Sequence, residues 1–101
     1  MFSAIDRIAD TLQSRARTTG CATYTCRDGL EVVFVQVAGQ CILTLSMPVG
    51  PVAEESIFRW REALGVPHSL KPSVINGTVE FRWPSAGTGS TGLARRHPTC
   101  P

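Results

Sequence analysis

Hydrophobic residues recur along the first 20 positions with the spacing of a helix. They stand at three- and four-residue steps and make one apolar stripe, formed by Phe2, Ile5, Ala9, Leu12 and Ala16. Ser3 and Asp6 resemble a capping box at the start of this stripe, and Gly20 supplies a stop after it. The pattern predicts an amphipathic helix that ends before Gly20.

From residue 21 to residue 47 the helical spacing gives way to β-branched and aromatic residues. Three such stretches, Cys21–Cys26, Leu30–Val37 and Cys41–Met47, are separated by Asp28-Gly29 and by the turn residues around Ala38-Gly39. Turn pairs of this kind favour two-residue hairpins. We therefore expect an antiparallel meander of three strands.

In the second half of the domain, a stretch with helical spacing is again followed by strand-like stretches. Val52–Leu64 has helical spacing and is followed by Gly65, whereas Leu70–Ile75 and Thr78–Trp83 flank the hairpin signal Asn76-Gly77. The sequence predicts an α+β fold in the order helix, three-stranded meander, helix, β-hairpin. We expect two layers, with both helices on one face of the sheet.

Composition divides the chain into a domain and a tail. Residues 1–83 have a globular balance of apolar and charged residues, whereas residues 84–101 consist mainly of Gly, Ser, Thr and Pro with a short basic cluster. We expect one folded domain followed by a disordered tail. No apolar stretch reaches the ~20 residues that a membrane helix needs, and the N-terminus has no apolar signal region, so the expected location is the cytosol.

Charge argues against a large nucleic-acid footprint. Residues 1–83 hold eight basic and eight acidic side chains, so the net charge of +2 comes from Arg95 and Arg96 in the tail. A neutral domain lacks the field that supplies most non-specific affinity for nucleic acids. A nucleic-acid-associated protein that uses the arginines of the first helix and the tail remains the alternative prediction.

Two-residue turns would sort the side chains of the meander onto two faces. One face would hold a core for the helices, made of Leu30, Val32, Phe34, Leu43, Leu45 and Met47. The other would hold Tyr24, Val33, Val35, Val37 and Ile42. This second face is more apolar than the solvated face of an antiparallel sheet usually is.

Two interpretations of the second face are open. On the first, the sheet curls so that the hairpin or a helix covers this face; on the second, the face binds a second copy or another protein. On the second interpretation the interface residues are Tyr24, Val33, Val35 and Ile42. A three-residue turn would instead shift the third strand to the opposite face.

No pattern of catalytic or metal-binding residues emerges. His68 and His97 are the only histidines, and neither belongs to a Ser/His/Asp or Cys/His order. We predict no catalytic residue, no cofactor and no metal site, and therefore a protein that is not an enzyme. A surface or turn position accounts for both histidines.

The four cysteines lack C-x-x-C spacing. Cys21, Cys26, Cys41 and Cys100 are interpreted as reduced thiols. We expect Cys21 and Cys41 on the core side of the sheet, on either side of Gln36 and too far apart for a disulfide. Cys100, in the tail, is the thiol expected to be exposed.

The element order of residues 1–83 resembles that of the class I type III secretion chaperones. This resemblance is one of topology, and it implies a small homodimer that binds effector segments through apolar patches. The shorter order of helix, three strands and helix is also that of the double-stranded-RNA-binding domain. That family begins its second helix with a lysine-rich motif, whereas residues 51–56 here are acidic. The leading prediction is a non-enzymatic protein-interaction module, either a homodimeric adaptor or a chaperone-like protein.

Overall fold

The structure, a computed structural model, describes residues 4–85 and holds two helices and five strands in this range. The elements are α1 (Ala4–Thr19), β1 (Cys21–Thr25), β2 (Glu31–Val37), β3 (Gln40–Ser46), α2 (Glu54–Ala63), β4 (Ser73–Ile75) and β5 (Thr78–Pro84). This order confirms the predicted α+β fold. The tail predicted for residues 84–101 lies outside the described range except for Pro84 and Ser85, and Pro84 still belongs to β5.

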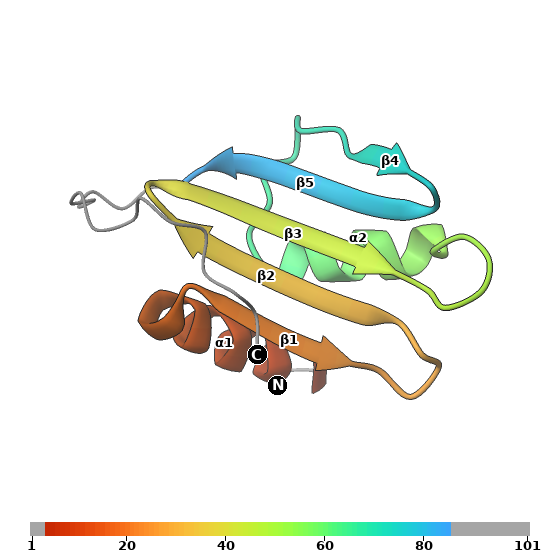
Figure 1. Cartoon of the computed structure of the whole chain (residues 1–101), viewed down its shortest axis with the longest axis horizontal. Helices are drawn as coiled ribbons and strands as arrows, with labels where there is room; N and C mark the ends of the chain where they lie inside the picture. The colour runs from red at the N-terminus through yellow and green to blue at the C-terminus, as the bar shows by residue number, and fades with distance from the viewer. Residues whose placement is uncertain (1–3, 86–101) are drawn as a thin grey trace.

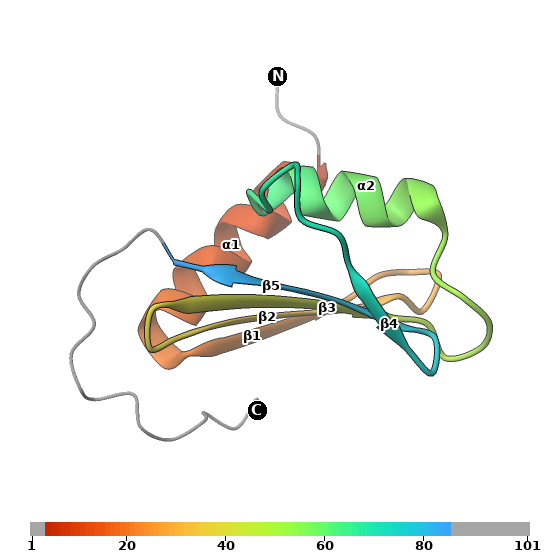
Figure 2. The ribbon, with the colours of Figure 1, turned by 90° about the horizontal axis from the view of Figure 1, so that it is seen from above.

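The five strands form one antiparallel sheet in the order β1-β2-β3-β5-β4. The C-terminal hairpin therefore extends the meander, because β5 pairs with β3 (Figure 1). Seen from above, α1 and α2 both lie on the same side of the sheet (Figure 2). The predicted two-layer arrangement is confirmed.

The hairpin between β1 and β2 has a longer loop than predicted. Gly29 donates its N–H to the Cys26 carbonyl at 3.0 Å and has a φ of +95°. Cys26 in turn donates to the Leu30 carbonyl at 2.8 Å, so three residues form the loop. A turn followed by a left-handed glycine is the usual three-residue hairpin connection. The extra loop residue changes the register of β1 by one position.

The two other hairpins have the predicted two-residue loops. Val37 pairs with Gln40 around Ala38 and Gly39, whose φ angles are +50° and +77°. Asn76 and Gly77 have φ angles of +51° and +81° between β4 and β5. Positive φ at both loop positions is the signature of a type I′ turn, whose twist matches that of the strands. The predicted register of β2 against β3 is therefore correct.

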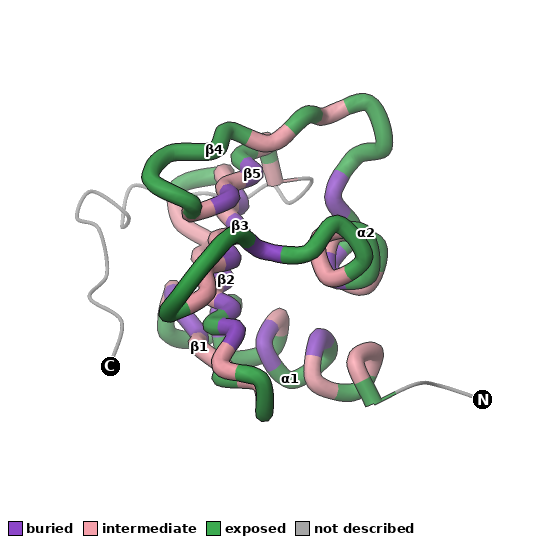
Figure 3. The backbone as a smooth tube through the Cα atoms, turned by 90° about the vertical axis from the view of Figure 1, so that its right-hand side faces the viewer, coloured by how far each residue is buried: buried purple, intermediate pink, exposed green. Residues whose placement is uncertain are grey.

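The core lies between the helices and one face of the sheet. Buried and half-buried residues alternate along β3, as expected for a strand with one covered face (Figure 3). Within residues 4–85, the five largest fully buried side chains come from the strands and from the residue just before β2. They are Phe81, Leu43, Leu45 and Val32 of the strands and Leu30 before β2. Ala9, Leu12 and Ala16 of α1 and Trp60 of α2 close the core from the helical side. Met47, also predicted here, is half-buried against the same cluster.

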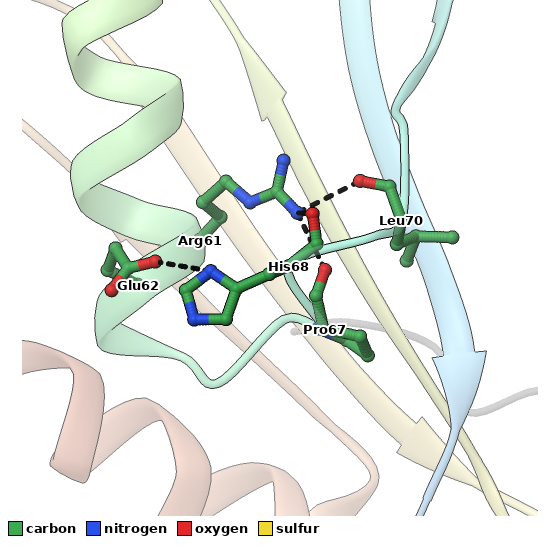
Figure 4. A network of polar contacts seen from close by, with 5 residues as sticks. All are labelled: Arg61, Glu62, Pro67, His68 and Leu70. Carbon is green, nitrogen blue, oxygen red and sulfur yellow. Dashed lines mark hydrogen bonds and ion pairs between the residues drawn. The ribbon is translucent and has the colours of Figure 1, made fainter.

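The end of α2 is fixed by backbone and side-chain hydrogen bonds. Val66 donates to the Arg61 carbonyl at 2.9 Å and Gly65 donates to the Glu62 carbonyl at 3.3 Å, which is a Schellman motif. The Arg61 guanidinium then donates to three carbonyls of the following loop, those of Pro67, His68 and Leu70 (Figure 4). It also lies 4.8 Å from the centre of the Phe81 ring. This arginine anchors the connection from α2 to the C-terminal hairpin.

Among residues 4–85, no helix is long and apolar enough to cross a membrane.

Candidate interaction surface

The sheet face opposite the two helices has an apolar centre. Val33, Val35 and Val37 of β2 lie on it, together with Ile42 of β3, which pairs with Val35. All four side chains are half-buried, and none belongs to the hydrophobic core cluster. We call this surface, with Val33, Val35, Val37 and Ile42 at its centre, the helix-free face. The structure thus brings together three of the four predicted interface residues: Val33, Val35 and Ile42.

Polar and charged side chains surround this centre. Thr23 and Thr44 lie directly opposite Val33 on the strands to either side, and Glu80 pairs with Thr44 one strand further on. The carboxylate of Glu80 accepts from Arg82, with an N–O distance of 2.7 Å. An apolar centre with a polar rim is typical of protein-interaction surfaces. The arrangement suits reversible contact with another protein.

Tyr24, the fourth predicted interface residue, lies on the opposite face. It pairs with Val32, whose side chain is fully buried in the core, and it is half-buried against the same cluster. Its ring lies 6.3 Å from the ring of Trp60 in α2, measured between centroids. The prediction for Tyr24 was wrong because the loop after β1 has three residues. Thr23 lies on the helix-free face in place of Tyr24. Treating Asp28-Gly29 as the last two residues of a three-residue loop would have predicted this position for Thr23.

A curl of the sheet, the first of the two interpretations of this face, is not seen in the described part of the chain. The C-terminal hairpin continues the sheet beyond β3, and both helices pack on the core side. Neither the hairpin nor a helix therefore covers Val33, Val35 or Ile42. The interpretation of this face as an interaction surface stays a prediction.

The cysteines differ from the expectation in two respects. Cys26 and Cys41 are free thiols, whereas Cys21 is disulfide-bonded, so the prediction of a reduced thiol is wrong for Cys21. Cys21 pairs with Val35 and Cys41 pairs with Gln36, so the two cysteines lie on opposite faces of the sheet and not together on the core side. The same register change that moved Tyr24 explains this. Cys100 lies outside the described residues.

Burial governs the chemistry of the two free thiols. It raises the pKa of Cys41, and a hydrogen bond with the Ser85 side chain opposes this change. Burial also raises the pKa of Cys26, and the negative charge of Asp28 adds to the effect. A raised pKa leaves less thiolate near neutral pH, so neither thiol has the environment of an activated nucleophile.

Two ion pairs lie on or beside α2. His68 lies 3.3 Å from the carboxylate of Glu62; the His68 side chain is 84% exposed and that of Glu62 is 40% exposed (Figure 4). Arg59 forms an ion pair with Glu55 one helical turn away at 2.8 Å. Within residues 4–85, no group of three or more His, Cys, Asp or Glu side chains is placed to hold a metal ion.

Two shallow grooves lie on the helical layer. The first, between α1 and α2, has a volume of about 670 Å³ and includes Ile5 and Phe58 in its lining. Phe58 is 60% exposed there, which makes it the most exposed aromatic side chain of the described residues. The second, between α1 and β1, has a volume of about 260 Å³ and is lined in part by Arg7 and Arg15.

Comparison with known proteins gives no relative from which a function could be transferred. No family model, no curated protein and no solved structure matches the chain. The functional argument therefore rests on the residues of the chain itself.

Proposed function

We propose that this protein is a non-enzymatic interaction module that pairs with a second copy of itself through the helix-free face. The observation that carries the proposal is the position of Val33, Val35 and Ile42 at the centre of a sheet face on which neither helix lies. Packing two such faces together would bury these side chains as the inner layer of a sandwich. We propose the cytosol as the place of this association.

The size of the face supports a reversible dimer. Strand β1 has five residues, and β2, β3 and β5 have seven each. At ~3.3 Å per residue and ~4.8 Å per strand, these four strands cover roughly 410 Å². This is about half of the ~800 Å² that each partner buries in a standard protein interface. An adaptor or chaperone-like role fits such an interface, because a weakly held second copy can be exchanged for another partner.

Charge does not oppose self-association. The domain up to Trp83 carries equal numbers of acidic and basic side chains, so two copies do not repel each other through net charge. On the helix-free face itself, Glu80 and Arg82 form an ion pair, and Glu31 at the start of β2 adds one negative charge at the rim. A domain without net charge offers no long-range attraction to a strongly charged partner, so its charge favours such a partner no more than a second copy of the chain.

Sedimentation velocity of a charge-insertion variant tests the proposal. Val33→Arg places a charge at the centre of the face without removing a core side chain, so we expect it to abolish self-association and to leave the circular dichroism spectrum unchanged. Val74→Arg is the matched control, because Val74 is 63% exposed on the edge strand β4 and lies on the other face. Measurements are made with a thiol reductant present. A monomeric wild type at the highest attainable concentration, or equal association of both variants, would contradict the proposal.

A second candidate function rests on the groove between α1 and β1. Arg7, Thr11 and Arg15 stand four residues apart along α1 and line this groove together with Thr23. Two exposed arginines on one helix face could contact successive phosphates of a nucleic acid. Binding of single- or double-stranded oligonucleotides that weakens steeply with salt, and that is lost in Arg7→Gln/Arg15→Gln, would support this candidate. Absence of binding at low salt would remove it.

A further inference from the structure

Strand β1 has an edge that no other strand of the described chain occupies. It is the outermost strand on its side of the sheet, and it pairs with β2 alone (Figure 1). An unpaired edge presents a row of backbone N–H and C=O groups that can pair with a further strand. The outermost strand on the other side, β4, has three residues, so β1 with five offers the longer edge.

Hydrogen bonds at the two ends of β1 show which of its residues face this edge. Gly20 accepts from the N–H of Gln36 at 3.0 Å, and Cys26 donates to the Leu30 carbonyl at 2.8 Å. Backbone groups along an antiparallel strand alternate between its two sides. The even-numbered residues of β1 therefore bond to β2, and the odd-numbered residues face the open edge.

One of the outward positions is closed by a side chain. The Thr19 hydroxyl lies 2.9 Å from the Cys21 carbonyl oxygen, and the Cys21 N–H donates to the same hydroxyl at 3.5 Å. No side chain of residues 4–85 closes Thr23 or Thr25 in this way. Each of these two threonines leaves one backbone N–H and one C=O available to a further strand.

A positively charged groove runs beside this edge. It lies between α1 and β1, has a volume of about 260 Å³ and is lined in part by Arg7 and Arg15 of α1 and by Thr23 and Tyr24 of β1. Both arginines are exposed, and the ion pairs of residues 4–85 involve neither of them. None of the described residues that line this groove is acidic, whereas two acidic residues line the groove between α1 and α2.

We propose that this edge and groove bind an extended acidic segment of a partner protein. The segment would add to β1 as an antiparallel strand whose backbone pairs with Thr23 and Thr25. Carboxylates four residues apart on one face of such a strand are separated by ~13 Å. Arg7 and Arg15 are separated by ~12 Å along α1. Each arginine would therefore meet one carboxylate, with the residue midway between the two opposite Tyr24.

The groove also selects the residue midway between the carboxylates. Its lining includes Leu12, which is buried, and Ile8 and Tyr24, which are half-buried against the core. A β-branched apolar side chain would cover this surface and suits a strand. We expect a segment with an acidic residue at its first and fifth positions and valine or isoleucine at its third.

A peptide fits this site better than a nucleic acid does. The open edge offers C=O groups as well as N–H groups, and a peptide backbone supplies partners for both, whereas phosphate oxygens only accept. The domain up to Trp83 carries no net charge, so the attraction of the two arginines is local and suits a partner with few charges. The site lies at the edge and on the helical side of the sheet, so it does not depend on the proposed dimer.

Fluorescence polarisation of a labelled peptide tests the inference. The probe is Thr-Glu-Thr-Val-Thr-Glu-Thr with fluorescein at its N-terminus, titrated with the full chain. We expect saturable binding that weakens roughly five- to tenfold in Arg7→Gln/Arg15→Gln, or when glutamine replaces both glutamates of the probe. Arg17→Gln/Lys71→Gln is the matched control, because it removes the same charge from exposed positions outside the groove. No saturable binding at about millimolar protein, or equal weakening in the two variants, would overturn the inference.

Methylated probes test the strand pairing itself. In an antiparallel segment centred opposite Tyr24, the threonines on either side of the valine lie opposite Thr23 and Thr25 and turn their N–H groups toward β1. The valine N–H points away from β1. Methylation of either threonine nitrogen should weaken binding at least tenfold, whereas methylation of the valine nitrogen should change it less than about twofold. Equal binding of the two kinds of methylated probe would overturn the strand addition.

Hydrogen exchange identifies the edge and separates the other occupants. Saturating probe should slow exchange of the Thr23 and Thr25 amide protons at least fivefold and leave that of Tyr24, already bonded to β2, unchanged. Slowing of the same protons with protein concentration alone would assign the edge to a second copy and overturn the inference. So would a single-stranded oligonucleotide that binds the groove more tightly than the probe. All titrations are repeated with Val33→Arg, so that their outcome does not depend on the proposed dimer.

Discussion

Val35 lies directly opposite Ile42 on neighbouring strands, and both alternate with buried core residues, so they lie on the helix-free face. The pair stands in the middle of the sheet, because β2 and β3 are flanked by β1 on one side and β5 on the other. Branched apolar residues at such a position stabilise the sheet through cross-strand contact. Their presence on the face without helices is the feature from which the proposed function follows.

Tyr24 should matter for stability and not for association. Its ring packs against Trp60 and the core, so we expect Tyr24→Ala to lower the free energy of unfolding by about 2–3 kcal/mol. Tyr24→Phe keeps the ring and should cost less than about 1 kcal/mol. Urea denaturation measures both changes. A Tyr24→Ala variant that is as stable as the wild type but no longer associates would contradict this prediction and show that Tyr24 belongs to the interface.

The contrast between Tyr24 and Val35 shows what local sequence can and cannot determine. Val35 could be placed correctly because Ala38-Gly39 forms the two-residue turn that its sequence favours. Tyr24 could not, because Asp28-Gly29 suits both a two-residue loop and the end of a three-residue loop, and a single residue exchanges the two faces. The carboxylate of Asp28 accepts a hydrogen bond from the N–H of Leu30 at 3.1 Å, which supports the longer loop.

Gly29 is the position at which this loop should be most sensitive. Its φ of +95° disfavours any side chain, and an added Cβ would lie 3.1 Å from Cγ of Pro48. We expect Gly29→Ala to destabilise the fold by about 2–3 kcal/mol in urea denaturation. Gly50→Ala is the control, because Gly50 also has a positive φ but an added Cβ there meets nothing within 4 Å. Equal effects of the two variants would show that the contact with Pro48 contributes nothing.

Whether a helix or the C-terminal hairpin packs on the helix-free face could not be predicted from the sequence, for a different reason. Alternation along β2 shows that this strand has apolar residues on both faces, but it carries no information about which neighbour packs on either. That depends on the sheet order, in which β5 joins the edge of β3 and does not fold underneath it. The position of Cys21 on the helix-free face followed from the same register that decided the position of Tyr24.

The Cys26 thiol should respond to pH in a defined direction. Burial, with a further contribution from Asp28, raises its pKa above the ordinary value of 9.0. The folded chain therefore holds its proton to higher pH than the unfolded chain does, so this contribution to stability is present below the ordinary pKa and is lost as the pH rises through the folded pKa. Alkylation of Cys26 should accelerate at higher pH than that of an unfolded thiol.

Asp28→Asn isolates the electrostatic part of this effect. It removes the negative charge and keeps an oxygen that can accept from the N–H of Leu30, so we expect a lower pKa and faster alkylation of Cys26. Asp10→Asn, in the exposed part of α1, is the control and should leave the rate unchanged. Mass spectrometry of the alkylated peptide over a pH series measures both. A slower or unchanged rate in Asp28→Asn would show that Asp28 does not raise the pKa of Cys26.

Self-association through the helix-free face is tested most directly by isotope-filtered nuclear Overhauser spectroscopy. Labelled and unlabelled copies of the reduced protein are mixed, so that every signal observed joins two chains. We predict intermolecular signals from the methyl groups of Val33, Val35 and Ile42 that strengthen with concentration and vanish in Val33→Arg. Intermolecular signals confined to the helical layer, at Ile5 and Phe58, or none at all at about millimolar concentration, would contradict the proposal.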